Sequence, residues 1–194
     1  MTPGEDQSPA PRPPKPGETP RFCPACGGAL ALRHLKEGEP ERLLCQACGR
    51  VEYLDPKVAA CVVPERQGRI LLLRRAINPG RGKWVMPGGF VDRGELPAEA
   101  AVREAAEEVG LEVEAGPLIG VFGTHQSPII IVYGTTRVIG EAAPLDETEG
   151  VRWFAPAEIP WESLAFESTR QALTALAEQR GWPPPPVPSE SAKK

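Results

Sequence analysis

The chain has 194 residues and a net charge of −4, with a pI near 5.4, a length that suits one ordinary domain and a small one. The acidic balance argues against a general nucleic-acid or anionic-membrane surface, since either would need a basic face. No apolar run approaches the roughly 18 residues of a membrane span, and the first residues lack the apolar core of a signal peptide, so we expect a cytoplasmic protein without a membrane partner.

Prolines crowd both ends of the chain, in residues 1–20 and in residues 183–194. Neither segment has the apolar surface needed to offset the entropy lost on ordering, so both are expected to be disordered or extended tails. Proline-rich runs can bind domains that read polyproline helices, and plain tails are the simpler interpretation.

Residues 21–54 contain two CxxC pairs, formed by Cys23 with Cys26 and by Cys45 with Cys48. Two such turns indicate a zinc ribbon, because four thiolates complete a tetrahedral shell with no open position. The unit is too short for its own core, so we expect zinc to supply its folding free energy. Disulfides are the alternative, and they fit an intracellular protein poorly.

Charges of both signs are interspersed along this ribbon. Between Arg33 and Glu52, the basic residues are Arg33, His34, Lys36, Arg42 and Arg50, and the acidic ones are Glu37, Glu39, Glu41 and Glu52. Because the two sets nearly offset each other, we interpret the ribbon as a packing or dimerisation module rather than a nucleic-acid reader. Four cysteines already complete a zinc shell, so His34 is expected at the surface.

Two short apolar runs follow, residues 57–64 and 69–74, with Gln67-Gly68 between them. Runs of this length around a glycine turn indicate a β-hairpin. Cys61 lies in the first run, where an unpaired thiol is expected to be a buried small hydrophobe.

Positive charge gathers before the acidic centre of the chain. A loop at residues 78–82 leads into a strand at residues 84–87, and the basic residues nearby are Arg74, Arg75, Arg81 and Lys83. We expect Arg81 and Lys83 to contact an anionic ligand such as a phosphate. Solvated surface positions are the alternative.

A helix is predicted over residues 97–109, because Pro97 suits a first helical turn and Gly110 suits the left-handed position after a helix. At the helical period, Glu104, Glu107 and Glu108 share one face. Like charges at these spacings repel, so a divalent cation with oxygen ligands is expected there. A solvated acidic surface helix is the alternative interpretation.

The remaining elements are strands at residues 112–123 and 129–139, an acidic loop entering a strand at 146–154, and a helix at 166–180. Strands before and after a central helix, with a second helix at the end, predict an α/β fold with a mixed sheet between helices.

The segment GFVDRGELPAEAAVREAAEEVGL, residues 89–111, resembles a complete Nudix box, with every fixed position present. So many specified positions make the resemblance specific, unlike a lone short glycine motif. The resemblance implies a Nudix α/β/α sandwich with a mixed sheet over residues 55–182, preceded by the zinc ribbon. It also implies Mg²⁺ or Mn²⁺ bound against a substrate diphosphate.

The resemblance further implies roles for individual residues. The implied Mg²⁺ or Mn²⁺ ligands are the Gly88 carbonyl and the side chains of Glu104 and Glu108, with Glu107 as an additional ligand and Glu147 as a further ligand or the base. Arg103 and Glu95 are expected to pair and hold the loop against the helix. The general base stays open among Glu104, Glu107 and Glu147.

The combination of ribbon and box resembles two groups of dinucleotide hydrolases, in which homodimers are common. NADH pyrophosphatases, which also remove NAD caps from RNA, carry a SQPWPFPxS-like stretch where this chain has GVFGTHQSPIIIVY. We therefore expect the ADP-ribose or FAD pyrophosphatase type, giving a nucleoside monophosphate and a phosphorylated product. Gln126, in the loop at 124–128, and Phe166 are expected to bind substrate. A catalytically silent sensor or adaptor is the alternative from another class.

Overall fold

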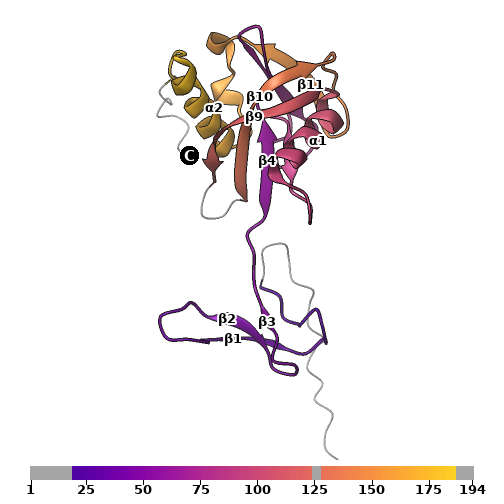
Figure 1. Cartoon of the computed structure of the whole chain (residues 1–194), viewed down its shortest axis with the longest axis vertical. Helices are drawn as coiled ribbons and strands as arrows, with labels where there is room; N and C mark the ends of the chain where they lie inside the picture. Colours follow the sequence, from indigo (N-terminus) through magenta and orange to yellow (C-terminus); the bar gives the residue numbers. More distant parts are fainter. Residues whose placement is uncertain (1–18, 124–127, 187–194) are drawn as a thin grey trace, which may run out of the picture. The chain divides into compact units, whose positions relative to one another are not determined.

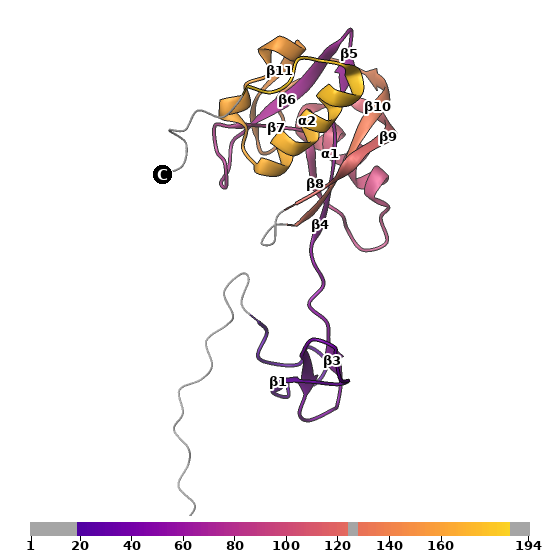
Figure 2. The ribbon, with the colours of Figure 1, turned by 90° about the vertical axis from the view of Figure 1, so that its left-hand side faces the viewer.

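The computed structural model describes residues 19–123 and 128–186 of the chain. These residues form two compact units, with the division between Asp55 and Pro56. Figures 1 and 2 show the elements of both units. The predicted tails lie mostly outside the described residues. Within the described part, no helix combines the length and apolar character needed to span a membrane.

The first unit is a small antiparallel sheet in the order β1-β2-β3. Its strands are β1 (Leu30–Arg33), β2 (Arg42–Cys45) and β3 (Val51–Glu52). Leu43 and Cys45 are buried, whereas Phe22 and Leu32 are exposed. So little apolar burial cannot fold a unit of this size alone, as the sequence predicts.

The second unit contains one mixed and one antiparallel sheet. The first has the order β8-β4-β10-β9 and the second the order β11-β6-β5, with β7 paired to β6. Their strands are β4 (Val58–Val62), β5 (Glu65–Arg66), β6 (Arg69–Arg75), β7 (Trp84–Val85), β8 (Gly88–Phe90), β9 (Glu112–Phe122), β10 (Ile129–Ile139) and β11 (Thr148–Phe154). The β4–β10 pair is parallel and the others are antiparallel.

The predicted hairpin turn at Gln67-Gly68 is confirmed, but the first apolar run does not supply the paired strand. The turn at Gln67-Gly68 joins β5 to β6, whereas β4 pairs with β8 and β10 in the other sheet. Both runs are buried on both faces, so their side chains carry no alternation that would select a partner. Strand pairing here is decided by segments distant in sequence.

Two α-helices lie on opposite sides of the sheets (Figure 1). Helix α1 spans Pro97–Val109, as predicted, and ends at Gly110 with a φ of 67°. Helix α2 spans Glu167–Arg180, and Phe166 precedes it as the N-cap residue. Two short 3₁₀ turns, Pro156–Glu158 and Trp161–Ser163, lead from β11 to α2.

The core has two parts, one beneath each helix. Along β4, Cys61 joins the cluster that contains the α2 residue Leu173, and Val62 joins the cluster that contains the α1 residue Ala105. Burial also raises the pKa of the Cys61 thiol to about 12. Cys61 is thus a buried small hydrophobe, as expected.

Replacing Gly110 with alanine is expected to destabilise the protein by about 1–2 kcal/mol, because an L-residue is strained in the left-handed region. Gly181 ends α2 with a similar φ of 66° and nothing near a built Cβ, whereas a Cβ at Gly110 would lie 3.3 Å from Leu145 Cδ1. Gly181→Ala is therefore the matched control for backbone strain alone. Chemical denaturation of both variants measures the difference, and an unchanged stability of Gly110→Ala would contradict the strain argument.

Candidate active site and cysteine cluster

The acidic face of α1 approaches β8 closely because two glycines stand there. A Cβ built on Gly89 would lie 2.2 Å from Glu104 Oε1, and one on Gly88 would lie 2.4 Å from Cys61 Sγ. A larger residue at Gly88 would push β8 away from β4, and one at Gly89 would displace the Glu104 carboxylate from the β8 backbone. The glycine pair thus brings the α1 carboxylates against the backbone of β8.

Glu108 is the most buried carboxylate of this face, with only 8% of its surface exposed. Its Oε2 accepts a hydrogen bond from the Gly88 N–H at 2.9 Å. Burial raises the pKa of Glu108 to about 7, against the opposing effect of that N–H, and the negative charge of Glu104 adds to the rise. A carboxylate in this setting gains from a nearby cation.

Arg103 joins the remaining carboxylates of the box. Its guanidinium donates to Glu95 at 2.8 and 3.1 Å, to Glu104 at 2.8 Å and to Glu107 at 2.9 Å, and to the Phe90 carbonyl at 3.2 Å. The predicted pair of Arg103 with Glu95 is confirmed, and it lowers the pKa of Glu95. One arginine therefore offsets much of the repulsion on this helix face.

Glu147 lies just before β11, and its side chain is exposed. Its backbone carbonyl accepts a hydrogen bond from the Ala76 N–H at 2.8 Å, which fixes this loop beside the end of β6. The charge of Glu147 contributes to raising the pKa of Glu108, so the two carboxylates share one region. No ion pair of the Glu147 side chain occurs among the described residues.

Arg75, at the end of β6, links the predicted residue Phe166 to this region. Its guanidinium lies 5.2 Å from the centroid of the Phe166 ring, and its Nε donates to the Pro79 carbonyl at 2.8 Å. The same charge partly counters the raised pKa of Glu108. Arg75 therefore lies near both the Phe166 ring and the Glu108 carboxylate.

The side chains of the other predicted substrate-binding residues have fewer contacts than those of Arg75 and Phe166. Arg81 and Lys83 are exposed, and neither side chain has a hydrogen bond or ion pair within the described ranges. The Lys83 carbonyl accepts from the Arg75 N–H at 3.0 Å, so this loop starts and ends beside β6. Gln126 lies outside the described residues.

Two residues that the sequence analysis left out stand beside the box. Phe90 follows the glycine pair and is 50% exposed, and the Lys57 ammonium lies 4.7 Å from the centroid of its ring. An aromatic residue in a strand normally predicts burial, so sequence gave no reason to select Phe90. Its position directly after two glycines of the box is the signal that could have done so.

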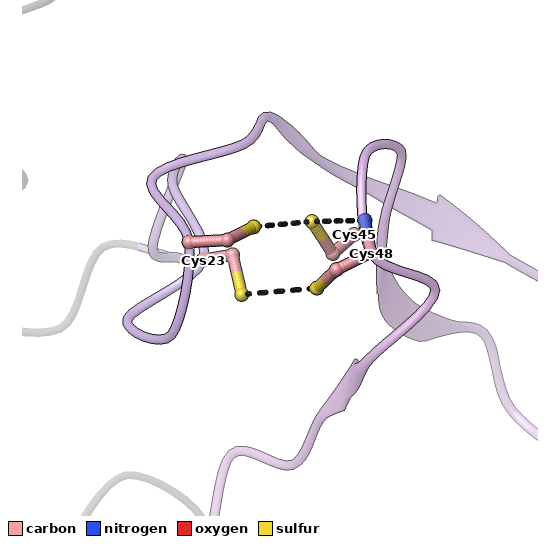
Figure 3. Close-up of side chains that lie close together, drawn as sticks. Cys23, Cys45 and Cys48 are labelled. Carbon is pink, nitrogen blue, oxygen red and sulfur yellow. Dashed lines mark hydrogen bonds between the residues drawn. The ribbon is translucent and has the colours of Figure 1, made fainter.

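The four ribbon cysteines form a cluster with all sulfur atoms within 4.8 Å of one another. Cys23 and Cys48 lie 3.9 Å apart and Cys26 and Cys45 lie 3.5 Å apart, sulfur to sulfur (Figure 3). Tetrahedral zinc with bonds of about 2.3 Å requires sulfur atoms about 3.8 Å apart. All five cysteines are free thiols, so the donor set fits zinc and no disulfide competes.

Mixed and antiparallel sheets between two helices, with a carboxylate-rich helix against a glycine pair, agree with the α/β fold and the acidic helix face that the sequence predicts. The chain belongs to the Nudix family: the NUDIX domain model matches residues 54–176. The Nudix N-terminal model, a zinc ribbon, matches residues 21–54.

Similar proteins carry two different names. An ADP-ribose pyrophosphatase of Methanocaldococcus jannaschii is 37% identical over 59% of this chain and 70% of its own length. The NAD-capped RNA hydrolase NudC of Stutzerimonas stutzeri is 29% identical over 87% of this chain but 60% of its own length. A Nudix hydrolase structure from Nitrosomonas europaea covers 84% of this chain and 95% of its own, with 33% identity and a TM-score of 0.76.

We expect the purified chain to carry one zinc ion per protomer, because the ribbon has too little core to fold without it. Elemental analysis measures the metal, and Cys45→Ser should lower its content and unfold the ribbon. Cys61→Ser is the matched control, since Cys61 lies in the second unit and should leave zinc content unchanged. An ordered ribbon in metal-free protein would contradict the assignment.

Proposed function

We propose that this protein hydrolyses a nucleoside diphosphate linked to a second group, with ADP-ribose or FAD preferred. The observation that carries this proposal is the approach of Glu104 and Glu108 to the glycine pair of β8. Water attacks one phosphorus, and the bond from that phosphorus to the bridging oxygen breaks. The products are AMP with ribose 5-phosphate, or AMP with FMN.

The oxygen donors around Gly88 fit Mg²⁺ or Mn²⁺, because both ions prefer carboxylate and carbonyl ligands. Glu104, Glu108 and the Gly88 carbonyl would hold the ion, with Glu107 and Glu147 as further donors. Bound there, the ion supplies charge neutralisation and lowers the pKa of its water. Arg103 keeps Glu104 in place meanwhile, since its guanidinium already bonds this carboxylate at 2.8 Å.

Glu147 is the carboxylate best placed to orient the attacking water. Glu104 and Glu107 each have a carboxylate oxygen hydrogen-bonded to the Arg103 guanidinium, so fewer of their lone pairs are free to accept from a water. The Glu147 side chain is exposed and has no such partner in the described part of the chain. This difference supports assigning Glu108 as a ligand and Glu147 as the base rather than as a further ligand.

The remaining groups suit the organic parts of the substrate. The Phe90 ring is exposed next to the glycine pair, and the Phe166 ring is held by Arg75. Either ring can stack on a purine or flavin, while Arg75, Arg81 and Lys83 supply positive charge for the diphosphate.

The preference for ADP-ribose or FAD has support from the chain and from one relative. The stretch GVFGTHQSPIIIVY replaces the SQPWPFPxS-like stretch of NADH pyrophosphatases, and the Methanocaldococcus jannaschii relative is named for ADP-ribose. Removal of NAD caps from RNA is the second candidate. It is favoured by the relative named NudC, whose similarity spans 87% of this chain.

Glu108→Gln should reduce turnover by about 100-fold or more, because losing a charged ligand in an electrostatic site costs several kcal/mol of barrier. Steady-state kinetics with added Mg²⁺ measure the loss, and thermal unfolding checks that the fold persists. Glu178→Gln removes an exposed carboxylate from α2 and should leave turnover unchanged. Near-normal turnover of Glu108→Gln, or unaltered activity in chelator, would refute the metal-site assignment.

Substrate preference is tested by ranking kcat/KM for ADP-ribose, FAD, NADH, NAD⁺ and an NAD-capped RNA under one set of conditions, since specificity is a ratio of these values. We expect ADP-ribose or FAD to lead. If NADH or the capped RNA leads by about tenfold, which corresponds to about 1.4 kcal/mol, the preference is wrong and the second candidate stands. No turnover of any substrate would favour a silent sensor.

A further inference from the structure

Alternation along the ribbon strands divides its side chains between two faces. Leu43 and Cys45 are buried, and the register places Leu32 opposite Leu43 on this cysteine side. Successive side chains of a strand point to opposite faces of the sheet, so the residues between these positions form the other face. We call it the arginine face, and its residues are Ala31, Arg33, Arg42, Leu44, Val51 and Tyr53.

The charges of the ribbon are not offset evenly. Three basic side chains have a carboxylate neighbour: Lys36 with Glu39 at 3.5 Å, Arg50 with Glu52 at 3.4 Å, and His34 with Glu41 at 3.9 Å. Among the described residues, Arg33 and Arg42 have no carboxylate partner. Arg33 donates only to the neighbouring Leu32 carbonyl, at 2.9 Å.

Arg33 and Arg42 also stand directly opposite each other in the register of β1 and β2. Side chains at such positions have Cβ atoms only about 4.5–5.5 Å apart, and like charges there destabilise a sheet. An anion bound between the two guanidinium groups would remove that repulsion. A phosphate group fits best, because guanidinium binds phosphate through paired hydrogen bonds.

Tyr53 supplies a second kind of contact on the same face. Its side chain is 59% exposed, and the Arg42 guanidinium lies 5.7 Å from the centroid of its ring. Exposed aromatic rings beside arginines are the surface on which unpaired bases stack. An acidic peptide would satisfy the arginines but leave this ring without a partner.

We propose that the arginine face binds single-stranded nucleic acid, with Arg33 and Arg42 on the phosphate backbone and Tyr53 stacked on a base. Bases within a duplex are already stacked on each other, so an unpaired strand is the matching occupant. This inference replaces the earlier interpretation of the ribbon as a packing module. It does not rest on the hydrolytic activity.

The test uses the full chain and a labelled single-stranded RNA of about ten nucleotides with a 5′ hydroxyl, measured by fluorescence anisotropy at several salt concentrations. For single strands, the logarithm of the binding constant falls with the logarithm of salt by about 0.7 per phosphate contact. Arg33→Gln combined with Arg42→Gln should weaken binding at least about tenfold and flatten this slope by about 1.4.

Two further variants separate stacking from charge. Tyr53→Leu should weaken binding about five- to 150-fold, the range expected for one stacked base, with the salt slope unchanged. Arg33→Lys combined with Arg42→Lys keeps both charges and should keep the slope.

The matched control is Lys36→Gln combined with Arg50→Gln, which removes the same net charge from residues that have carboxylate neighbours. Its affinity should stay within about twofold of the unaltered protein. The proposal fails if this control weakens binding as much as the arginine variant, if duplex binds as tightly as single strands, or if the unaltered protein does not bind.

Hydrolysis of ADP-ribose by the same variants should not change, because every altered residue lies in the ribbon. If the unaltered protein binds RNA but hydrolyses none of the substrates, the proposed function is refuted and this inference still holds.

Discussion

The close approach of helix α1 to the glycine pair of β8 is the constraint on which the catalytic unit depends. A side chain at Gly88 would collide with β4, and one at Gly89 would occupy the space of the Glu104 carboxylate, so bare backbone keeps β8 in place and leaves room for this carboxylate. The approach buries Glu108 and aligns it with the Gly88 N–H. The same face of α1 carries Glu104, Glu107 and Glu108, and the repulsion between these carboxylates is unfavourable unless a positive charge offsets it.

Compensation for that charge is divided between two sources. Arg103 bonds Glu95, Glu104 and Glu107, and it holds the loop of the box against the helix by way of the Phe90 carbonyl. Glu108 receives a backbone N–H and the more distant charge of Arg75 instead. The hydrogen bonds of Arg103 therefore support the structure of the box. The Glu108 carboxylate has no hydrogen bond to Arg103, so a bound cation would stabilise its negative charge. This division explains why the most buried acid is the strongest candidate for a ligand.

Local signals predicted the helices well and the strand partners poorly. Pro97 and Gly110 fixed the bounds of α1 because each acts through its own backbone. The partners of β4 could not be predicted, since both faces of this strand are buried and its neighbours β8 and β10 come later in the chain. In the site, fixed motif positions located the carboxylates. Phe90 and Lys57 were not selected, and Arg75 was selected only for its charge, because their proximity to the site depends on those long-range pairings.

The ribbon shows why counting charges misleads. Between Arg33 and Glu52, five basic and four acidic residues nearly cancel in the sequence, yet the fold pairs three of the basic side chains and leaves Arg33 and Arg42 together. The strand register decides what a charge count cannot, because it fixes which side chains stand directly opposite one another. Two arginines far apart in sequence thereby become neighbours, and their like charges have no carboxylate partner within the described residues.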